Sequence, residues 1–223
     1  MPKAVSAARA RRPRNSLTVE EILDVAEAVA AGGIEALTIR AVANELESSP
    51  MALYRYFGTK DELVDALLNR VLGRMEPPLE SASWIDDLGA FARNHREMLS
   101  LHQWAVTALF ARPAPGPNAL PIGEWALRIL ERGGIEGDEA VAIFSGIIGL
   151  NYGWASFVVA RAGGAGDSLA EDLVSPGVAE AFPLTASVAV PMSRYGSVEH
   201  YDLVLGYLLA GVLSTSAPPE PGK

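Results

Sequence analysis

The chain of 223 residues contains no cysteine, which excludes disulfide bonds and cysteine-based zinc sites. Residues 1–15 have no apolar run, so they do not resemble a secretory signal. No segment shows the alternation of apolar and polar residues that is typical of a strand. These absences favour an all-α protein, and we expect it to be cytoplasmic.

Positive charge is scarce, because the formal net charge is −9. By itself this excess of acid disfavours nucleic-acid binding. However, residues 76–223 hold 8 Lys or Arg against 17 Asp or Glu, whereas residues 1–75 hold 10 of each. Residues 1–15 contain 5 basic side chains and no acid. We expect a disordered basic arm there, which either contacts DNA or remains a solvated tail.

Charge is also absent from residues 140–160, a stretch of 21 residues. Its length would suffice to cross a bilayer. It contains polar residues and three glycines, and no second segment matches it. A helix buried on all sides within a dimer gives the same pattern, so we expect no membrane span.

Capping signals place four helices in the first third of the chain. Thr18 and Glu21 form a capping box at the first helix, and Gly32-Gly33 ends it. Ser49 is expected to cap the third helix, with Pro50 as its first residue. The four predicted helices cover 18–31, 38–46, 50–57 and 61–75.

Glu76-Pro77-Pro78 breaks the helical pattern and predicts a boundary. The expected organisation is an arm (1–15), a helix-turn-helix domain (16–75) and a larger helical domain (79–216). Further helices are predicted over 84–99, 101–111, 122–132, 138–161 and 198–213. Residues 163–177 are polar, glycine-rich and expected to be mobile, and the conformation of 178–195 stays open.

The predicted third helix is short and carries small, aromatic and basic side chains, which suits insertion into the major groove of DNA. Residues 17–72 resemble the DNA-binding domain of the TetR family of transcriptional regulators. The resemblance rests on the two-helix spacing, on Leu53-Tyr54-x-Tyr56-Phe57, on Lys60 and on Leu63. Trp84, Ala111-Arg112-Pro113 and Gly133-Gly134-Ile135 resemble a tetracycline-repressor type of C-terminal domain.

The resemblance implies an all-α homodimer that binds double-stranded operator DNA and a small-molecule effector. The dimer would form through helices near 138–161 and 198–213. Carried over position by position, the expected DNA contacts are Thr38, Arg40, Ser49, Pro50, Met51, Ala52, Tyr54, Arg55, Tyr56 and Lys60. Leu53 and Phe57 are instead expected to be core residues.

The turn between the second and third helices departs from the family pattern, which has glycine where this chain has Glu47. A left-handed backbone at this glutamate would be strained.

An effector cavity is expected among the aromatic residues of the larger domain, suited to an apolar or aromatic ligand. Asn118 is a further polar candidate. The candidate ligand contacts are His95, Trp104, Arg112, Trp125, Phe144, Asn151, Tyr152 and Trp154.

No cofactor is expected, and a metal-assisted tetracycline site is disfavoured because the family's ligating histidine is replaced by apolar Ala108 and Leu109. The leading hypothesis is a ligand-responsive repressor that is released from a pseudo-palindromic operator, with Arg112-Pro113 as a hinge acting on the fourth helix. Two alternatives stay open, namely a helical enzyme and a membrane-associated helical protein. No nucleophile–base pair or paired carboxylates support the enzyme.

Overall fold

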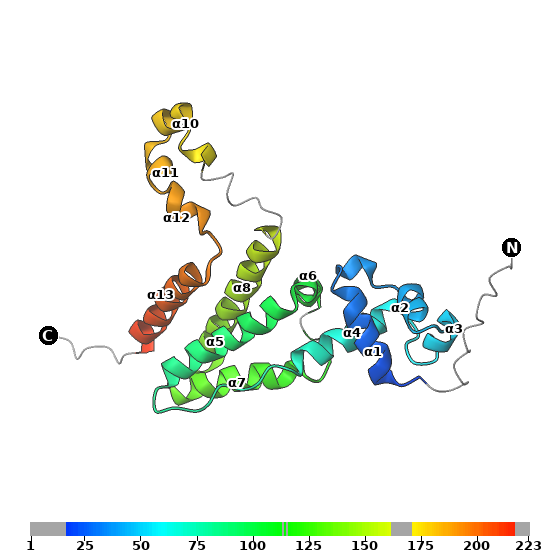
Figure 1. Cartoon of the computed structure of the whole chain (residues 1–223). Helices are drawn as coiled ribbons and strands as arrows, with labels where there is room; N and C mark the ends of the chain where they lie inside the picture. The colour runs from blue at the N-terminus through cyan, green and yellow to red at the C-terminus, as the bar shows by residue number, and fades with distance from the viewer. Residues whose placement is uncertain (1–16, 113, 115, 162–170, 217–223) are drawn as a thin grey trace. The chain divides into compact units, whose positions relative to one another are not determined.

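The computed structural model describes residues 17–112, 114, 116–161 and 171–216, and within these ranges the regular elements are all helices (Figure 1). This confirms the all-α fold. The chain forms two compact units, Met1–Leu68 and Asn69–Lys223, which divide inside one continuous helix, α4 (Lys60–Leu72). The predicted arm over 1–15 lies outside the described residues.

The first unit is a small helical domain with its own core. The capping box predicted at its first helix is present, because Thr18 Oγ1 accepts from the Glu21 N–H (3.1 Å) and the Glu21 carboxylate accepts from the Thr18 N–H (3.0 Å). Its elements are α1 (Val19–Ala30), η1 (Ile34–Ala36), α2 (Ile39–Glu45), α3 (Pro50–Leu53) and the start of α4. Its fully buried side chains include Ile22, Leu37, Val42, Leu53 and Leu63.

The third helix is shorter than predicted. α3 ends at Leu53 rather than Phe57, because the N–H groups of Tyr56 and Phe57 both donate to the Leu53 carbonyl and close the chain into turns. The prediction that the Ser49 side chain caps this helix is wrong. Its backbone carbonyl, not its hydroxyl, accepts from the Ala52 N–H (2.9 Å).

The turn between α2 and α3 has the backbone strain that the sequence predicts. Glu47 has φ of 49°, in the left-handed region. The Ser48 N–H donates to the Ala43 carbonyl (2.8 Å) and the Glu47 N–H donates to the Asn44 carbonyl (3.0 Å). This is the Schellman pattern, in which the Glu47 position is usually glycine.

The second unit is a larger helical bundle in which α5, α7 and α8 pack on one another and α13 packs on α5 and α8 (Figure 1). The segment that the sequence left open, 178–195, contains most of three short helices. The elements are α5 (Trp84–Leu101), η2 (Gln103–Ala105), α6 (Val106–Ala111), α7 (Ala119–Arg132), α8 (Gly137–Arg161), α10 (Pro176–Ala181), α11 (Pro183–Ser187), α12 (Ala189–Ser193) and α13 (Val198–Ser216). Of the predicted mobile segment 163–177, residues 163–170 lie outside the described ranges.

The corner after α7 requires its two glycines for different reasons. A Cβ at Gly133 would lie 2.7 Å from the Trp84 indole, so the absence of a side chain lets the start of α5 pack against the end of α7. Gly134 has φ of 74°, which L side chains rarely adopt.

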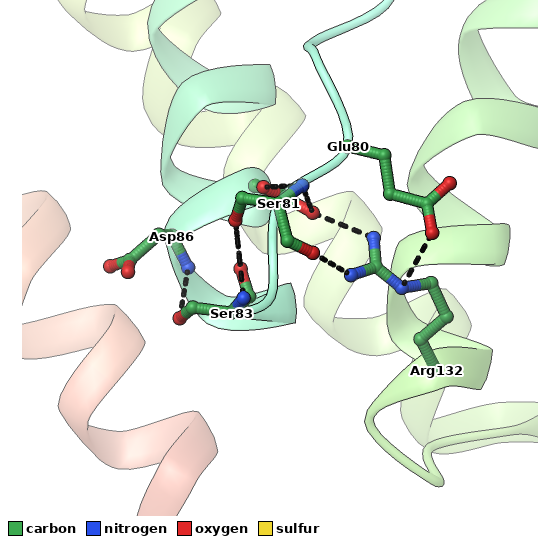
Figure 2. Close-up of polar contacts among 6 residues, drawn as sticks. Glu80, Ser81, Ser83, Asp86 and Arg132 are labelled. Carbon is green, nitrogen blue, oxygen red and sulfur yellow. Dashed lines mark hydrogen bonds and ion pairs between the residues drawn. The ribbon is translucent and has the colours of Figure 1, made fainter.

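A buried carboxylate fixes the entry into α5 (Figure 2). Both oxygens of Asp87 accept from the Ser81 N–H (3.1 Å each), and Asp87 Oδ2 also accepts from Arg132 Nη1 (2.6 Å). Arg132 Nη2 donates to the Ser81 carbonyl (2.6 Å), so one guanidinium binds both the carboxylate and the loop. Hydrogen bonding from Ser81, assisted by Arg132, holds the pKa of Asp87 below its ordinary value despite burial.

We predict that Asp87→Asn lowers the free energy of unfolding by about 1–3 kcal/mol at pH 7, because a buried hydrogen-bonded charge is lost. Since the pKa of Asp87 is lowered in the fold, its stabilisation is present above the unfolded-state pKa and is lost as the pH falls below about 4. Urea unfolding of the wild type and of Asp87→Asn at pH 7 and pH 3 measures the difference in their free energies of unfolding. Asp86→Asn, one residue earlier and exposed, is the control. An equal loss in both variants would contradict the assignment.

We also predict that Glu47→Asn raises the free energy of unfolding by up to about 1 kcal/mol, because asparagine tolerates the left-handed backbone better than glutamate. Glu45→Asn, in the helical backbone of α2, should instead lower it slightly. Thermal unfolding of the two variants checks the difference in sign, and destabilisation by both would contradict it.

Candidate DNA-binding and ligand-binding sites

The helix-turn-helix of the first unit exposes the side chains that the sequence selects for DNA contact. Met51, two residues before the buried Leu53, is 72% exposed. Tyr54, directly after Leu53, is 46% exposed. Arg40, near the start of α2, is also exposed. Met51 on α3 and Tyr54 directly after it leave apolar surface uncovered by the core, so this face is available for a partner.

The basic side chains of this unit are not neutralised locally. Arg40, Arg55 and Lys60 are exposed, and none of them forms an ion pair with any residue that the structure describes. Unpaired surface cations are available to bind phosphate or base edges.

Thr38 caps α2. Its Oγ1 accepts from the Ala41 N–H (3.0 Å) as the cap of α2, so its hydroxyl hydrogen stays available. Ser49 is exposed, while Pro50 and Ala52 are half-buried. Leu53 and Phe57 are buried, as expected for core residues.

Tyr56 is placed differently from the expectation that it contacts phosphate. Its hydroxyl donates to the backbone carbonyl of Leu17 (2.6 Å). A phenol has one hydrogen to donate, and this bond uses it. The geometry therefore favours a positioning role for Tyr56, which holds the turn after α3 against the start of α1.

In the second unit, the structure brings together four of the expected ligand residues. Asn151 Nδ2 lies 3.1 Å from His95 Nδ1, and the His95 ring meets the Tyr152 ring edge to face at 5.8 Å between centroids. Phe144 joins them through Phe91, which contacts both Phe144 and His95. Phe110 packs on the other side of Tyr152.

Of the remaining expected ligand residues, Trp154 adjoins this cluster, because its ring contacts the Tyr201 ring at 5.7 Å between centroids. Trp154 Nε1 donates to the carbonyls of Gly196 (3.0 Å) and Ser197 (3.1 Å), so its indole joins α8 to the turn before α13. Trp104, Arg112 and Trp125 are half-buried, and within the described residues no aromatic contact links them to His95. Asn118 instead forms hydrogen bonds with Asn69 of α4.

Tyr201 is part of the polar cluster and was missed by the sequence analysis. It is fully buried, and its hydroxyl donates to Asn151 Oδ1 (2.7 Å). The Arg96 guanidinium lies 4.8 Å from its ring centroid. Residues 151 and 201 are far apart in the chain, so no local pattern could have paired them.

Burial sets the protonation of the cluster. Desolvation lowers the pKa of His95 to about 4 and raises the pKa of Tyr152 to about 12. Both side chains are therefore neutral at pH 7 and act through hydrogen bonds rather than charge.

A metal site and a membrane span are two other features that bear on the class of this protein. No group of three or more His, Cys, Asp or Glu side chains there could hold a metal ion. One described helix segment, Gly137–Val158 of α8, is long and apolar enough to cross a membrane by length and composition alone.

Comparison with known families identifies the class. Residues 22–67 match the model of bacterial regulatory proteins of the tetR family, and residues 76–216 match the tetracyclin repressor-like C-terminal domain. The chain belongs to the TetR family of transcriptional regulators, which confirms the resemblance seen in the sequence.

Curated relatives are regulators as well. An HTH-type transcriptional regulator of Saccharopolyspora erythraea is 35% identical over 125 residues, covering 55% of this chain and 53% of the relative. The HTH-type transcriptional repressor DrrR1 of Streptomyces coeruleorubidus is 35% identical over 135 residues, covering 59% of this chain and 50% of the relative. The chain thus spans about half the length of these relatives.

Solved structures extend the likeness to nearly the whole chain. Apo ActR of Streptomyces coelicolor has a TM-score of 0.79 at 28% identity, covering 94% of this chain and 98% of ActR. ActR in complex with actinorhodin has a TM-score of 0.79 at 28% identity, covering 91% of this chain and 99% of ActR. BioQ with its double-stranded DNA operator has a TM-score of 0.59 at 25% identity, covering 66% of this chain and 90% of BioQ.

We predict that Arg40→Ala weakens specific DNA binding by about 1–3 kcal/mol, a loss of roughly fivefold to 150-fold, because a bidentate contact to a base edge is removed. Fluorescence anisotropy at fixed salt measures this. Arg128→Ala, an exposed arginine of the second unit paired with Glu124, is the control and should leave the affinity unchanged. Equal affinities of wild type and Arg40→Ala would contradict the assignment.

Proposed function

We propose that this protein is a ligand-responsive transcriptional repressor that binds a pseudo-palindromic operator as a homodimer and is released by a small, largely apolar or aromatic effector. The observation that supports it most strongly is the exposed face of α2 and α3, where unpaired cations flank exposed Met51 and Tyr54. DrrR1 is named a repressor and BioQ is described with its operator, which supports the same role here.

Arg40 would read a base edge, and Met51 and Ala52 would contact a thymine methyl at the groove floor. Ser49 and Pro50 lie at the same helix start. Thr38, Tyr54, Arg55 and Lys60 would bind phosphates and fix the register of the helix in the groove.

Homodimerisation is supported by apolar surface that the single chain leaves uncovered. α8 exposes Val141 and Phe157, and α13 exposes Leu203, Val204 and Tyr207, the last at 75%. Large apolar side chains left exposed on two helices that pack together favour an association site there. A second copy packed on α8 and α13 would cover it, and would also account for the uncharged stretch without a membrane. Such a dimer would place two recognition helices about 34–36 Å apart, one turn of DNA.

The effector would bind beside the His95 and Tyr152 cluster, whose aromatic neighbours Phe91, Phe110 and Phe144 favour a flat apolar molecule. ActR is described in complex with actinorhodin and with (S)-DNPA, so a related fold does hold such a ligand.

Transmission to DNA would pass through the last turn of α4. The Asn118 N–H donates to Asn69 Oδ1 and Asn118 Nδ2 donates to the Asn69 carbonyl, both at 2.8 Å. The fit is close, because a Cβ at Gly73 would lie 2.4 Å from Asn118 Nδ2 and one at Gly116 would lie 2.5 Å from Asn69 Oδ1. Asn118, directly before α7, is therefore hydrogen-bonded to α4, and α4 continues into the DNA-binding unit. These contacts support a hinge at Asn118, a few residues after the Arg112-Pro113 junction that the sequence suggests.

We predict that Asn118→Ala weakens the coupling between effector and operator while both are still bound. Loss of the hydrogen bond from Asn118 Nδ2 to the Asn69 carbonyl should reduce the effector-induced drop in operator affinity by about threefold to tenfold, while the bond from the backbone N–H remains. Operator titrations with and without effector measure this. Asn94→Ala, on α5, is the control. An unchanged drop in Asn118→Ala would contradict the proposed path.

The proposed function is tested by gel-shift binding of the purified protein to the DNA flanking its own gene, with nonspecific DNA as competitor. Specific retardation by two protomers per site supports it. Retardation that nonspecific DNA competes away equally would contradict it and favour the helical enzyme without DNA binding. Loss of the protein from solution unless detergent is added would favour the membrane-associated alternative.

A further inference from the structure

The buried cluster of the second unit determines which nitrogen of His95 holds the proton. Asn151 is fully buried, and its Nδ2 lies 2.9 Å from the Ala92 carbonyl and 3.1 Å from His95 Nδ1. A carbonyl can only accept, so the Asn151 amide group must direct its NH₂ toward Ala92. The second hydrogen of that NH₂ then points to His95 Nδ1.

His95 Nδ1 must therefore accept a hydrogen bond. In a neutral imidazole the nitrogen that accepts is unprotonated, and the other nitrogen donates. The Asn151 orientation is fixed a second time by Tyr201, whose hydroxyl donates to Asn151 Oδ1 (2.7 Å). His95 consequently presents an N–H at Nε2.

This Nε2–H has no acceptor among the residues that the structure describes, although the side chain is only 3% exposed. The Tyr152 hydroxyl, whose ring contacts His95, also has no partner there. Neither atom is fully shielded from solvent, so water or a ligand can reach both. Two unused donors thus adjoin one aromatic cluster.

We propose that His95 Nε2–H and the Tyr152 hydroxyl are the donors that select the effector, and that the effector is an uncharged aromatic compound with a ring carbonyl oxygen. This inference rests on the proposed function, because it specifies the ligand of the same site. A carbonyl oxygen can accept from either donor without needing a countercharge. A hydrocarbon would leave the donors unsatisfied, and an ammonium compound would add an unpaired cation to an apolar site.

A pair of probes that differ only in the acceptor tests the proposal. 9-Fluorenone and fluorene share one three-ring skeleton, and only fluorenone has the carbonyl. Equilibrium dialysis against the full-length protein should give about tenfold tighter binding of fluorenone. Tyr152→Phe should reduce this preference, and His95→Phe should abolish it, while the affinity for fluorene stays within about twofold in both variants. Ser187→Ala removes an exposed hydroxyl of α11 and should change neither.

Equal binding of the two probes to wild type, or no binding of fluorenone at its solubility limit, would overturn the proposed ligand class. A preference that survives in His95→Phe would overturn the role of His95. Far-UV circular dichroism verifies that each variant is folded, and Tyr152→Phe, which removes one oxygen atom only, keeps the test valid if His95→Phe does not fold. Gel shifts on the same preparations distinguish failure of this inference from failure of the proposed function. Operator binding without carbonyl preference overturns this inference alone, whereas a lack of operator binding overturns the proposed function.

Discussion

The second unit depends on the burial of one amide. Asn151 on α8 bonds the Ala92 carbonyl and His95 on α5, and accepts from Tyr201 on α13. The three contacts use both hydrogens and the oxygen of its side chain, in a place with no access to water. Because an unsatisfied buried amide costs about 1–3 kcal/mol, each helix must keep its position relative to the other two. The same constraint orients the imidazole that we assign to the effector.

The two units divide the chemistry of a regulator between them. The first leaves Arg40, Arg55 and Lys60 without acidic partners among the described residues, whereas the second holds the acidic excess of the chain. An acidic body with a locally basic face disfavours DNA contact anywhere except at that face. In the function that we propose, the effector would instead be recognised by neutral donors in an apolar cluster, so the two ligands would use different kinds of site. α4 is the covalent link, and Asn118 and Asn69 connect it to the bundle.

Local signals in the sequence predicted much of the fold. The capping box of Thr18 and Glu21, the strain at Glu47 and the extent of α8 all depend on neighbours within a few residues, which a sequence displays directly. The early end of α3 was missed because its closing hydrogen bonds converge on one carbonyl, a detail of geometry. Tyr56 and Tyr201 were also beyond a local analysis. Each makes its defining hydrogen bond to a residue 39 or 50 positions away, and such pairings follow from packing alone.

The buried amide of Asn151 puts the proton of a neutral His95 on Nε2, and we propose that this N–H faces a ligand. Long-range proton–nitrogen NMR on protein labelled with ¹⁵N-histidine tests this directly, because the chain has three histidines and His95→Phe identifies the signal. We expect the His95 ring to be neutral, with Nε2 protonated, from pH 8 down to at least about pH 5, because burial lowers the pKa of His95 to about 4. A proton on Nδ1, or titration near the ordinary value of about 6.5, would contradict it.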